Sequence, residues 1–198
     1  MEHKFDIEQF NTVLHNRRSI YPYQFAKDTK IADQIIWQIL ENAIRAPTHK
    51  LTEPWRFKVF SDQGLQRFAD LQTEIYTKYA GEKFKEKKLK NLREYPLMSS
   101  HVILIAMKRT TAISIPEIEE IIATACAIEN IYLSLSAYNL GGYLSTGGIT
   151  YITEAKSYFN LEANDKIVGI FYVGCIDTIA NPLSQRKPVK EKVEWTTK

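Results

Sequence analysis

The sequence predicts a single α+β domain over residues 1–198. Several segments carry apolar side chains at the 3.6-residue period of a helix, whereas residues 101–107 and 166–175 are continuous apolar runs of strand length. Helices and strands do not alternate regularly, so the doubly wound parallel class is not indicated. With 44% hydrophobic and 25% charged residues, the chain has the composition of a globular protein that buries a core.

The first third of the chain is predicted to contain two helices and a strand. Residues 5–16 place apolar side chains near helical spacing. A stripe of isoleucines, leucine and alanine over 31–43 predicts the second helix, with Asp28 or Thr29 as its N-cap. Residues 55–60, rich in aromatic and β-branched side chains, predict the first strand.

The middle of the chain is predicted to hold a helix, a charged helix and a buried strand. Ser61 or Asp62 can cap a helix that runs to about Ala80. The charged stretch 77–94 follows and is expected to be an exposed helix. Residues 101–107 contain almost only apolar side chains, which is typical of a strand buried on both faces.

The last third begins with a long helix from Pro116 to about Leu140. Its apolar and small residues occupy several faces, which predicts a central helix or one at a subunit interface; Glu129 interrupts it and is expected at an edge or in an ion pair. The remaining elements are expected to be a turn or short strand at 141–148, a short helix at 153–159, a second buried strand at 166–175, and an extended tail with one helical turn near 189–193.

The positive charge of the chain is local. The net charge is +3, yet residues 77–94 alone carry seven Lys and Arg against three Glu, and the rest of the chain is near neutral. A solvated helix face or a mobile lid is the simplest interpretation of such a stretch. A nucleic-acid patch is the alternative, although no RNA- or DNA-binding motif accompanies it.

Cysteine and histidine usage gives no sign of a disulfide framework or a metal site. Cys126 and Cys175 have apolar neighbours and are expected to be reduced, core-facing thiols. The four histidines show no metal-site spacing, so no metal is expected. The N-terminal residues lack the apolar stretch of a signal peptide and no run approaches membrane-spanning length, so we expect a cytoplasmic protein.

A cluster of phosphate-binding side chains is the most informative feature. Arg17, Arg18 and Ser19 follow the first predicted helix, and Arg45 and His49 lie at the end of the second. Guanidinium groups hold phosphate through paired, charge-assisted hydrogen bonds, so this set suggests a phosphorylated ligand. There is no Gly-x-Gly-x-x-Gly motif, no Walker loop and no hydrolase nucleophile motif, which argues against Rossmann, P-loop and acyl-transfer enzymes.

Ordered landmarks along almost the whole chain resemble those of the nitroreductase family. They are Arg17-Arg18-Ser19, Ala46-Pro47-Thr48 through Pro54-Trp55-Arg56-Phe57, Asn139-Leu140-Gly141-Gly142, Lys166-Ile167-Val168-Gly169 and Arg186-Lys187-Pro188. The His49-Lys50 variant is similar to the smallest, compact members. The resemblance implies a nitroreductase α+β fold, with a mixed central sheet flanked by helices, and an intertwined homodimer that binds FMN at the subunit interface.

The resemblance also assigns flavin-binding roles to residues of this chain. Arg17, Arg18 and Ser19 match the opening motif that serves the FMN phosphate and ring edge, and Arg45 and His49 match flavin contacts of the compact subgroup. The other matches are Leu144, Ser145 and Thr146, which line the ring, and Arg186, a late phosphate-binding residue. Leu51 and Glu53 depart from the Asn and Gln that are common in the family, whereas Trp55 is expected to be a core residue.

The activity implied is that of an FMN-dependent NAD(P)H oxidoreductase. NAD(P)H gives a hydride to flavin N5 and leaves, and an electron-poor acceptor such as a nitroaromatic or a quinone then takes its place. No side chain is required as acid or base, so no catalytic residue is assigned. Two alternatives stay open: the same fold acting on an enone or a halogenated aromatic, or an anion- or nucleic-acid-binding module built on residues 77–94.

Overall fold

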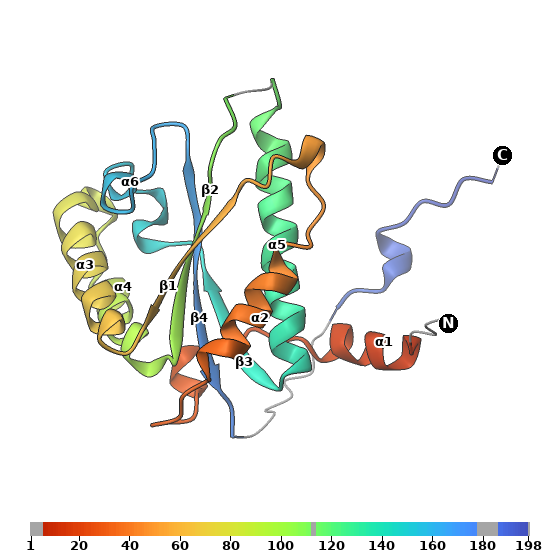
Figure 1. The fold of residues 1–198 in the computed structure, drawn as a ribbon, viewed down its shortest axis with the longest axis horizontal. Helices are drawn as coiled ribbons and strands as arrows, with labels where there is room; N and C mark the ends of the chain where they lie inside the picture. The colour runs from red at the N-terminus through yellow and green to blue at the C-terminus, as the bar shows by residue number, and fades with distance from the viewer. Residues whose placement is uncertain (1–5, 112–113, 178–185, 198) are drawn as a thin grey trace.

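A four-stranded antiparallel sheet forms the centre of the protein in a computed structural model, which describes residues 6–111, 114–177 and 186–197. The strand order is β1-β2-β4-β3. The strands are β1 (Trp55–Ser61), β2 (His101–Met107), β3 (Leu140–Ser145) and β4 (Lys166–Cys175). Figure 1 shows these strands between two groups of helices.

Six α-helices and several short 3-10 turns surround the sheet in the described part of the chain. The helices are α1 (Ile7–Asn16), α2 (Asp33–Ala43), α3 (Gln63–Tyr79), α4 (Glu86–Glu94), α5 (Glu117–Ala137) and α6 (Ala155–Tyr158). The 3-10 turns span Pro22–Gln24, His49–Leu51, Gly81–Lys83, Pro96–Met98, Gly148–Tyr151 and Val189–Glu191. None of these helices is long and apolar enough to cross a membrane.

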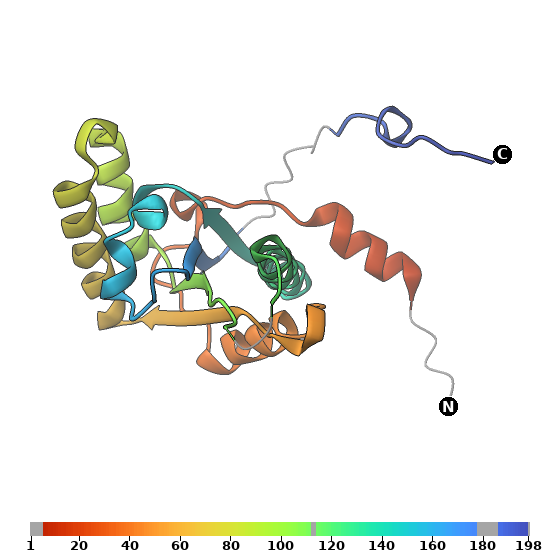
Figure 2. The same cartoon turned by 90° about the horizontal axis from the view of Figure 1, so that it is seen from above.

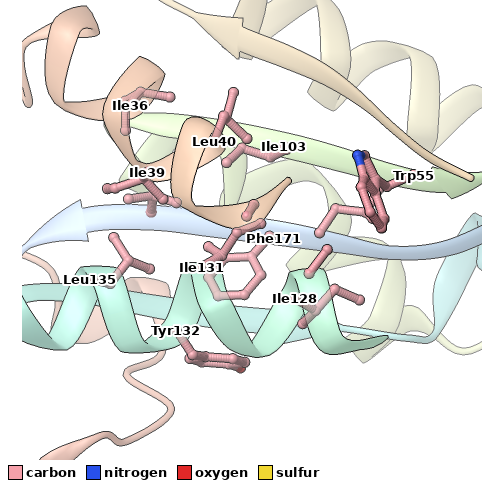
Figure 3. Packing of buried hydrophobic residues seen from close by; sticks show 14 of the residues in the cluster. Ile36, Ile39, Leu40, Trp55, Ile103, Ile128, Ile131, Tyr132, Leu135 and Phe171 are labelled. Carbon is pink, nitrogen blue, oxygen red and sulfur yellow. The ribbon is translucent and has the colours of Figure 1, made fainter. Parts of the chain in front are cut away.

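Two apolar layers hold the helices to the sheet, and β2 contributes to both. Alternate side chains of β2 point to opposite faces, so Ile103 joins the layer under α2 and α5 while Leu104 joins the layer under α3 and α4. Every residue of β2 is buried, which confirms the strand predicted from its continuous apolar run. Figure 3 shows the first layer, where Ile39 of α2, Ile131 of α5 and Phe171 of β4 lie together.

Helix α5 lies very close to the sheet at β3. A Cβ atom on Gly142 would fall 2.5 Å from both Leu135 Cδ1 and Phe171 Cε1, so only glycine fits between helix and strand. Gly142 therefore allows the close contact between α5 and β3, whereas Gly141 leaves room for Phe25 and Ile176. The predicted turn or short strand at 141–148 is a strand as far as Ser145 and a 3-10 turn from Gly148.

The α+β fold is confirmed, with two differences in detail. The second helix begins after Ala32, not at Asp28 or Thr29, because Asp28 adopts a left-handed conformation (φ 56°) and the Thr29 hydroxyl donates to the Ala26 carbonyl. Throughout the described residues the sheet is antiparallel and not mixed. The segment that connects β1 to β2 begins and finishes at the same end of the sheet, because Ser61 at the end of β1 pairs with His101 at the start of β2.

Helix α1 contrasts with the rest because it projects from the body of the protein (Figure 2). None of its residues is buried. Its apolar side chains Ile7, Phe10 and Leu14 are exposed in the isolated chain. An amphipathic helix with an exposed apolar stripe is typical of a surface that another element covers.

The two cysteines are free thiols and both are half-buried. Cys126 lies on α5 and Cys175 ends β4, where each packs at the edge of the layer under α2 and α5. Trp55 is buried in the same layer, which confirms its expected core role.

Candidate functional site

Tyr132 of α5 ties together the loop after α1 and the end of β3. Its hydroxyl lies 3.2 Å from Ser19 Oγ and accepts a hydrogen bond of 3.0 Å from the backbone N–H of Leu144. The guanidinium carbon of Arg17 lies 5.0 Å from the centre of the Tyr132 ring, in cation–π geometry. We refer to Arg17, Ser19, Tyr132 and Leu144 as the Tyr132 corner.

The two guanidinium groups beside this corner are held by different partners. Arg17 Nε lies 3.5 Å from a carboxylate oxygen of Glu129, which confirms the ion pair expected for that residue. Arg18 Nη1 donates to the backbone carbonyl of Arg17 at 2.8 Å and to that of His15. Glu129 is half-exposed, so solvent screens the electrostatic attraction between its carboxylate and Arg17. An anionic ligand could therefore replace the Glu129 carboxylate as the partner of Arg17.

A cavity of about 410 Å³ opens beside the Tyr132 corner, between α1 and the α5–β3 surface. Arg17 and Arg18 line it together with polar residues of α1, and Tyr132 and Leu135 form its apolar wall. Figure 3 shows the Tyr132 ring on the opposite side of α5 from Ile39 and Leu40, and the ring still packs edge-on against Phe171 of the same apolar layer. The corner thus combines cations with an aromatic wall, which suits a planar ligand that carries a phosphate.

The strand end that follows Leu144 brings in a residue from the basic segment. Ser145 is buried, and its Oγ accepts a hydrogen bond of 3.3 Å from Lys88 Nζ of α4. Burial lowers the pKa of the Lys88 ammonium. Thr146 is exposed immediately beyond the strand. Gly148 has φ 71°, a left-handed conformation that favours glycine, and it starts the 3-10 turn that closes this loop.

Arg45 and His49 lie in a second place, which we refer to as the His49 corner. His49 Nδ1 pairs with the Glu119 carboxylate in the first turn of α5, and Arg45 pairs with Glu41 one turn earlier on α2. Both ion pairs are exposed, so each contributes little to folding.

The loop after His49 is strained. Lys50, Leu51 and Glu53 all adopt positive φ angles between 44° and 54°. The Thr48 hydroxyl braces the loop by accepting from the Glu53 N–H at 3.2 Å. Non-glycine residues in this conformation are costly and cluster at ligand-binding sites. Glu53 and Leu51 are both exposed.

The two corners lie far apart within one chain. Thirteen positions of α5 separate Glu119, at the His49 corner, from Tyr132. At 1.5 Å of rise per residue that is about 20 Å along the helix. One chain therefore brings Arg17, Arg18, Ser19, Leu144, Ser145 and Thr146 to one place and His49 to another, while Arg45 lies on the α2 side of α5, paired with Glu41.

Arg186 lies in neither corner. It is exposed at the start of the described tail segment, 186–197, and no hydrogen bond or ion pair within the described residues links it to the other predicted site residues. Its phosphate-binding role stays a prediction.

Sequence reasoning missed the two residues that organise the first corner. Tyr132 fitted the apolar stripe of α5 and Lys88 fitted an exposed basic helix. A buried tyrosine needs a hydrogen-bond partner for its hydroxyl, and that requirement was the available signal for Tyr132. For Lys88 the available signal was its position in the helix. It precedes Leu89 by one residue and Leu92 by four, so it lies on the side of α4 that faces the protein.

The chain is similar to known proteins over most of its length. A family model described as the nitroreductase family matches residues 14–175. YdjA of Escherichia coli (strain K12), provisionally named an NAD(P)H nitroreductase, is 28% identical over 162 residues, which cover 82% of this chain and 85% of that protein.

Solved structures show the same fold. A nitroreductase-like family protein from Bacillus cereus has a TM-score of 0.79 at 25% identity, covering 99% of this chain and 98% of that one. The FMN-dependent nitroreductase NfnB from Mycobacterium smegmatis, solved in complex with NADPH, has a TM-score of 0.74 at 14% identity, covering 97% and 100%.

Proposed function

The chain belongs to the nitroreductase family, and from this premise we propose that it is an FMN-dependent NAD(P)H oxidoreductase acting on electron-poor small molecules. The observation that carries the proposal is the Tyr132 corner. One buried hydroxyl holds Ser19 beside the strand end at Leu144, and its ring holds the Arg17 guanidinium. The family resemblance assigns a flavin-binding role to both segments, and the hydrogen bonds of Tyr132 to both of them support that proposal.

The residues present fit FMN chemically. Arg17 and Arg18 offer guanidinium donors, which match the oxygens of a phosphate, and the cavity beside them has an aromatic wall. Bound FMN would supply the redox chemistry, taking a hydride from NAD(P)H and passing it to the acceptor in a second half-reaction. The names of YdjA and NfnB, which include NAD(P)H and FMN respectively, support this assignment.

The protein's own contribution is binding, orientation and charge. Tyr132 fixes the Arg17–Ser19 loop against β3, so the cations are in place before the ligand arrives. Ser145 is buried, which keeps water from its hydroxyl. No described side chain needs to act as an acid or base, because hydride transfer itself moves no separate proton and the protons that acceptor reduction consumes can come from solvent.

We further propose that the site is completed by a second copy of the chain. The His49 corner is about 20 Å along α5 from the Tyr132 corner, and this separation favours an arrangement in which the two corners that serve one flavin come from different subunits. Two observations support an interface on α1 and α5: the exposed apolar side chains of α1, and Ile118 and Ile122 of α5, which are 58% and 55% exposed.

The acceptor is proposed as a nitroaromatic or a quinone, with an enone or a halogenated aromatic as the alternative. The loop at 49–53 departs from the common family pattern at Leu51 and at Glu53, and both side chains are exposed to solvent. We therefore assign differences in acceptor preference to this loop. The arginines at positions 17 and 18 are assigned to cofactor binding. The anion- or nucleic-acid-binding alternative loses support because α4 buries Lys88 and pairs Lys90 with Glu94.

Purified protein tests the proposal directly. We expect a yellow protein that binds one FMN per subunit and is a dimer by light scattering. NADH and NADPH oxidation is then followed with a panel of nitroaromatics, quinones, enones and halogenated aromatics. A colourless protein that neither takes up FMN nor oxidises either nicotinamide would overturn the proposed function. An Arg17→Ala/Arg18→Ala variant is the negative control, and we expect it to bind less FMN than the parent protein.

A further inference from the structure

We propose that Lys88 is a flavin-site residue whose ammonium compensates the negative charge that reduction places on the flavin beside residues 145–147. The proposal rests on the function proposed above and adds a member to the site that the family motifs do not mark. It changes the interpretation of the basic segment, from a solvated face or a lid to a helix that delivers one cation to the cofactor.

The Lys88 side chain lies along the loop that follows β3. Its Nζ donates to Ser145 Oγ at 3.3 Å, and a Cβ atom on Gly147 would lie 3.2 Å from the same nitrogen. A Cβ atom on Gly148 would lie 3.0 Å from Lys88 Cε. The ammonium and the last part of its stem therefore lie against Ser145, Gly147 and Gly148, at the end of the segment 144–146 that the resemblance places beside the ring.

Helix α4 fixes Lys88 in this position. Leu92, one turn later on the same side, is buried, and its Cδ2 would be 2.9 Å from a Cβ on Gly148. The Gln72 side chain of α3 donates a hydrogen bond to the Leu92 carbonyl, so α4 is anchored to the helix behind it. Because both the helix and the loop are anchored, Lys88 is held beside Ser145 by packing, whereas Lys87 next to it is exposed.

The charge of Lys88 is not balanced by a carboxylate. No Asp or Glu of the described residues lies within 4.0 Å of its Nζ, whereas Lys30, Lys90, Lys108 and Lys166 each have an acidic partner. The serine hydroxyl is a neutral partner, and the neighbouring Tyr143 stays un-ionised because burial raises its pKa. A half-buried cation with only neutral partners favours an anion at that position.

The consequence is a preference for the reduced form of the cofactor. An FMN reduced by hydride carries more negative charge than oxidised FMN, and a fixed cation in a partly dry site stabilises it more strongly. Lys88 therefore raises the protein's affinity for reduced FMN more than its affinity for oxidised FMN. It does so without transferring a proton or an electron itself. The Arg17–Ser19 segment, by contrast, binds the phosphate, whose charge is the same in both redox states.

The test compares Lys88→Met with Lys87→Met, an exposed neighbour on the same helix. Oxidised FMN affinity is measured by fluorescence quenching, and the midpoint potential of the holoprotein by titration against a reference dye. For Lys88→Met we expect oxidised FMN affinity within about twofold of the parent and a tenfold loss of reduced FMN affinity. A tenfold change corresponds to a potential lowered by about 30 mV for a two-electron couple. Lys87→Met and Lys88→Arg should keep the parental potential.

The outcomes separate this inference from the function on which it rests. If the parent binds FMN and oxidises NAD(P)H but Lys88→Met keeps the parental potential, the role of Lys88 is overturned and the function stands. If the parent binds no FMN, both are overturned. Lys88→Gln is a second neutral variant, and circular dichroism establishes that each variant is folded before its potential is compared.

Discussion

The Tyr132 corner and the His49 corner hold their basic side chains in opposite ways. In the first, Arg17 lies over a buried ring and the Tyr132 hydroxyl joins two segments far apart in sequence. In the second, His49 and Arg45 make exposed ion pairs with Glu119 and Glu41. The first corner is built into the core, whereas the second is held on the surface by a strained loop.

This difference indicates which half of the site a single chain can preorganise. Hydrogen bonds to a buried hydroxyl fix the first corner in the isolated subunit, because breaking them would leave buried polar groups unpaired. Exposed ion pairs between long side chains fix little. The His49 corner therefore needs a contact from outside its own chain to become rigid, and the proposed second subunit supplies it.

The largest effect is expected from Arg17→Ala. Removing a charged hydrogen-bond donor costs about 1.5–3 kcal/mol of binding free energy, so FMN affinity should fall roughly 10- to 100-fold. Stability should change little, because the Glu129 partner is half-exposed. Fluorescence titration of FMN together with urea unfolding measures both. A loss of stability without a loss of FMN affinity would show that Arg17 is structural only.

Tyr132→Phe removes the hydroxyl but keeps the ring. The Leu144 N–H then loses its side-chain partner, which costs about 1–3 kcal/mol when a buried donor is left unpaired. We expect a lower urea midpoint and weaker FMN binding together. Tyr138→Phe, at an exposed tyrosine near the end of α5, is the matched control and should change neither. If Tyr132→Phe matches the parent in both assays, the hydroxyl does not organise the corner.

Alkaline pH should lower the free energy of unfolding of the sheet that carries the Tyr132 corner. Tyr172 is fully buried on β4, next to β3, and burial raises its pKa above the ordinary value of about 10. Its neutral form is the folded form, so its contribution is complete below pH 10 and is lost as pH rises toward the folded pKa. The slope is about 1.4 kcal/mol per pH unit for one group. Urea unfolding at several alkaline pH values measures it, and Tyr172→Phe should lower the slope.

His49→Ala should separate stability from binding. The exposed ion pair with Glu119 is worth about 0–1 kcal/mol, so the unfolding free energy of the subunit should stay close to the parent. FMN affinity of the dimer should still fall by severalfold, because we propose that His49 contacts the cofactor bound at the other subunit's corner. Glu119→Gln removes the same ion pair but keeps His49, and it should leave FMN affinity unchanged. Equal losses in both variants would assign His49 a structural role.

The smallest effect is expected from Leu51→Asn. Leu51 is 81% exposed and has φ 54°, a conformation that asparagine adopts far more readily than leucine. The change should stabilise the protein by up to about 1 kcal/mol, measured as a rise in the thermal midpoint. A lower midpoint would show that Leu51 makes a contact that its exposure does not reveal.

The sequence predicted the parts of the fold that depend on local pattern. The runs at 101–107 and 166–175 became β2 and β4, and the isoleucine stripe became α2, because burial on a fixed face leaves a periodic signature. The helix start at Asp33 was missed because Asp28 and Thr29 have the chemistry of caps, and only the left-handed turn at Asp28 rules them out.

The sequence predicted which residue types form the candidate site, but it did not predict how these residues are arranged in space. The motifs indicated the cations, but the pairing of Ser19 with Tyr132 spans 113 positions and that of Lys88 with Ser145 spans 57. Such contacts arise from packing of whole helices on the sheet, which no local pattern encodes. The separation of His49 from the Arg17 segment likewise follows from the length of α5.

A subunit-mixing experiment tests most directly whether one site is built from two chains. One chain carries Arg17→Ala/Arg18→Ala and the other carries Arg45→Ala/His49→Ala, with different affinity tags. Each homodimer should bind FMN weakly. The purified heterodimer should have one intact site, formed by the unchanged corner of each chain, and should bind one FMN per dimer at the parental affinity. A heterodimer that binds FMN no better than the two homodimers would contradict the account.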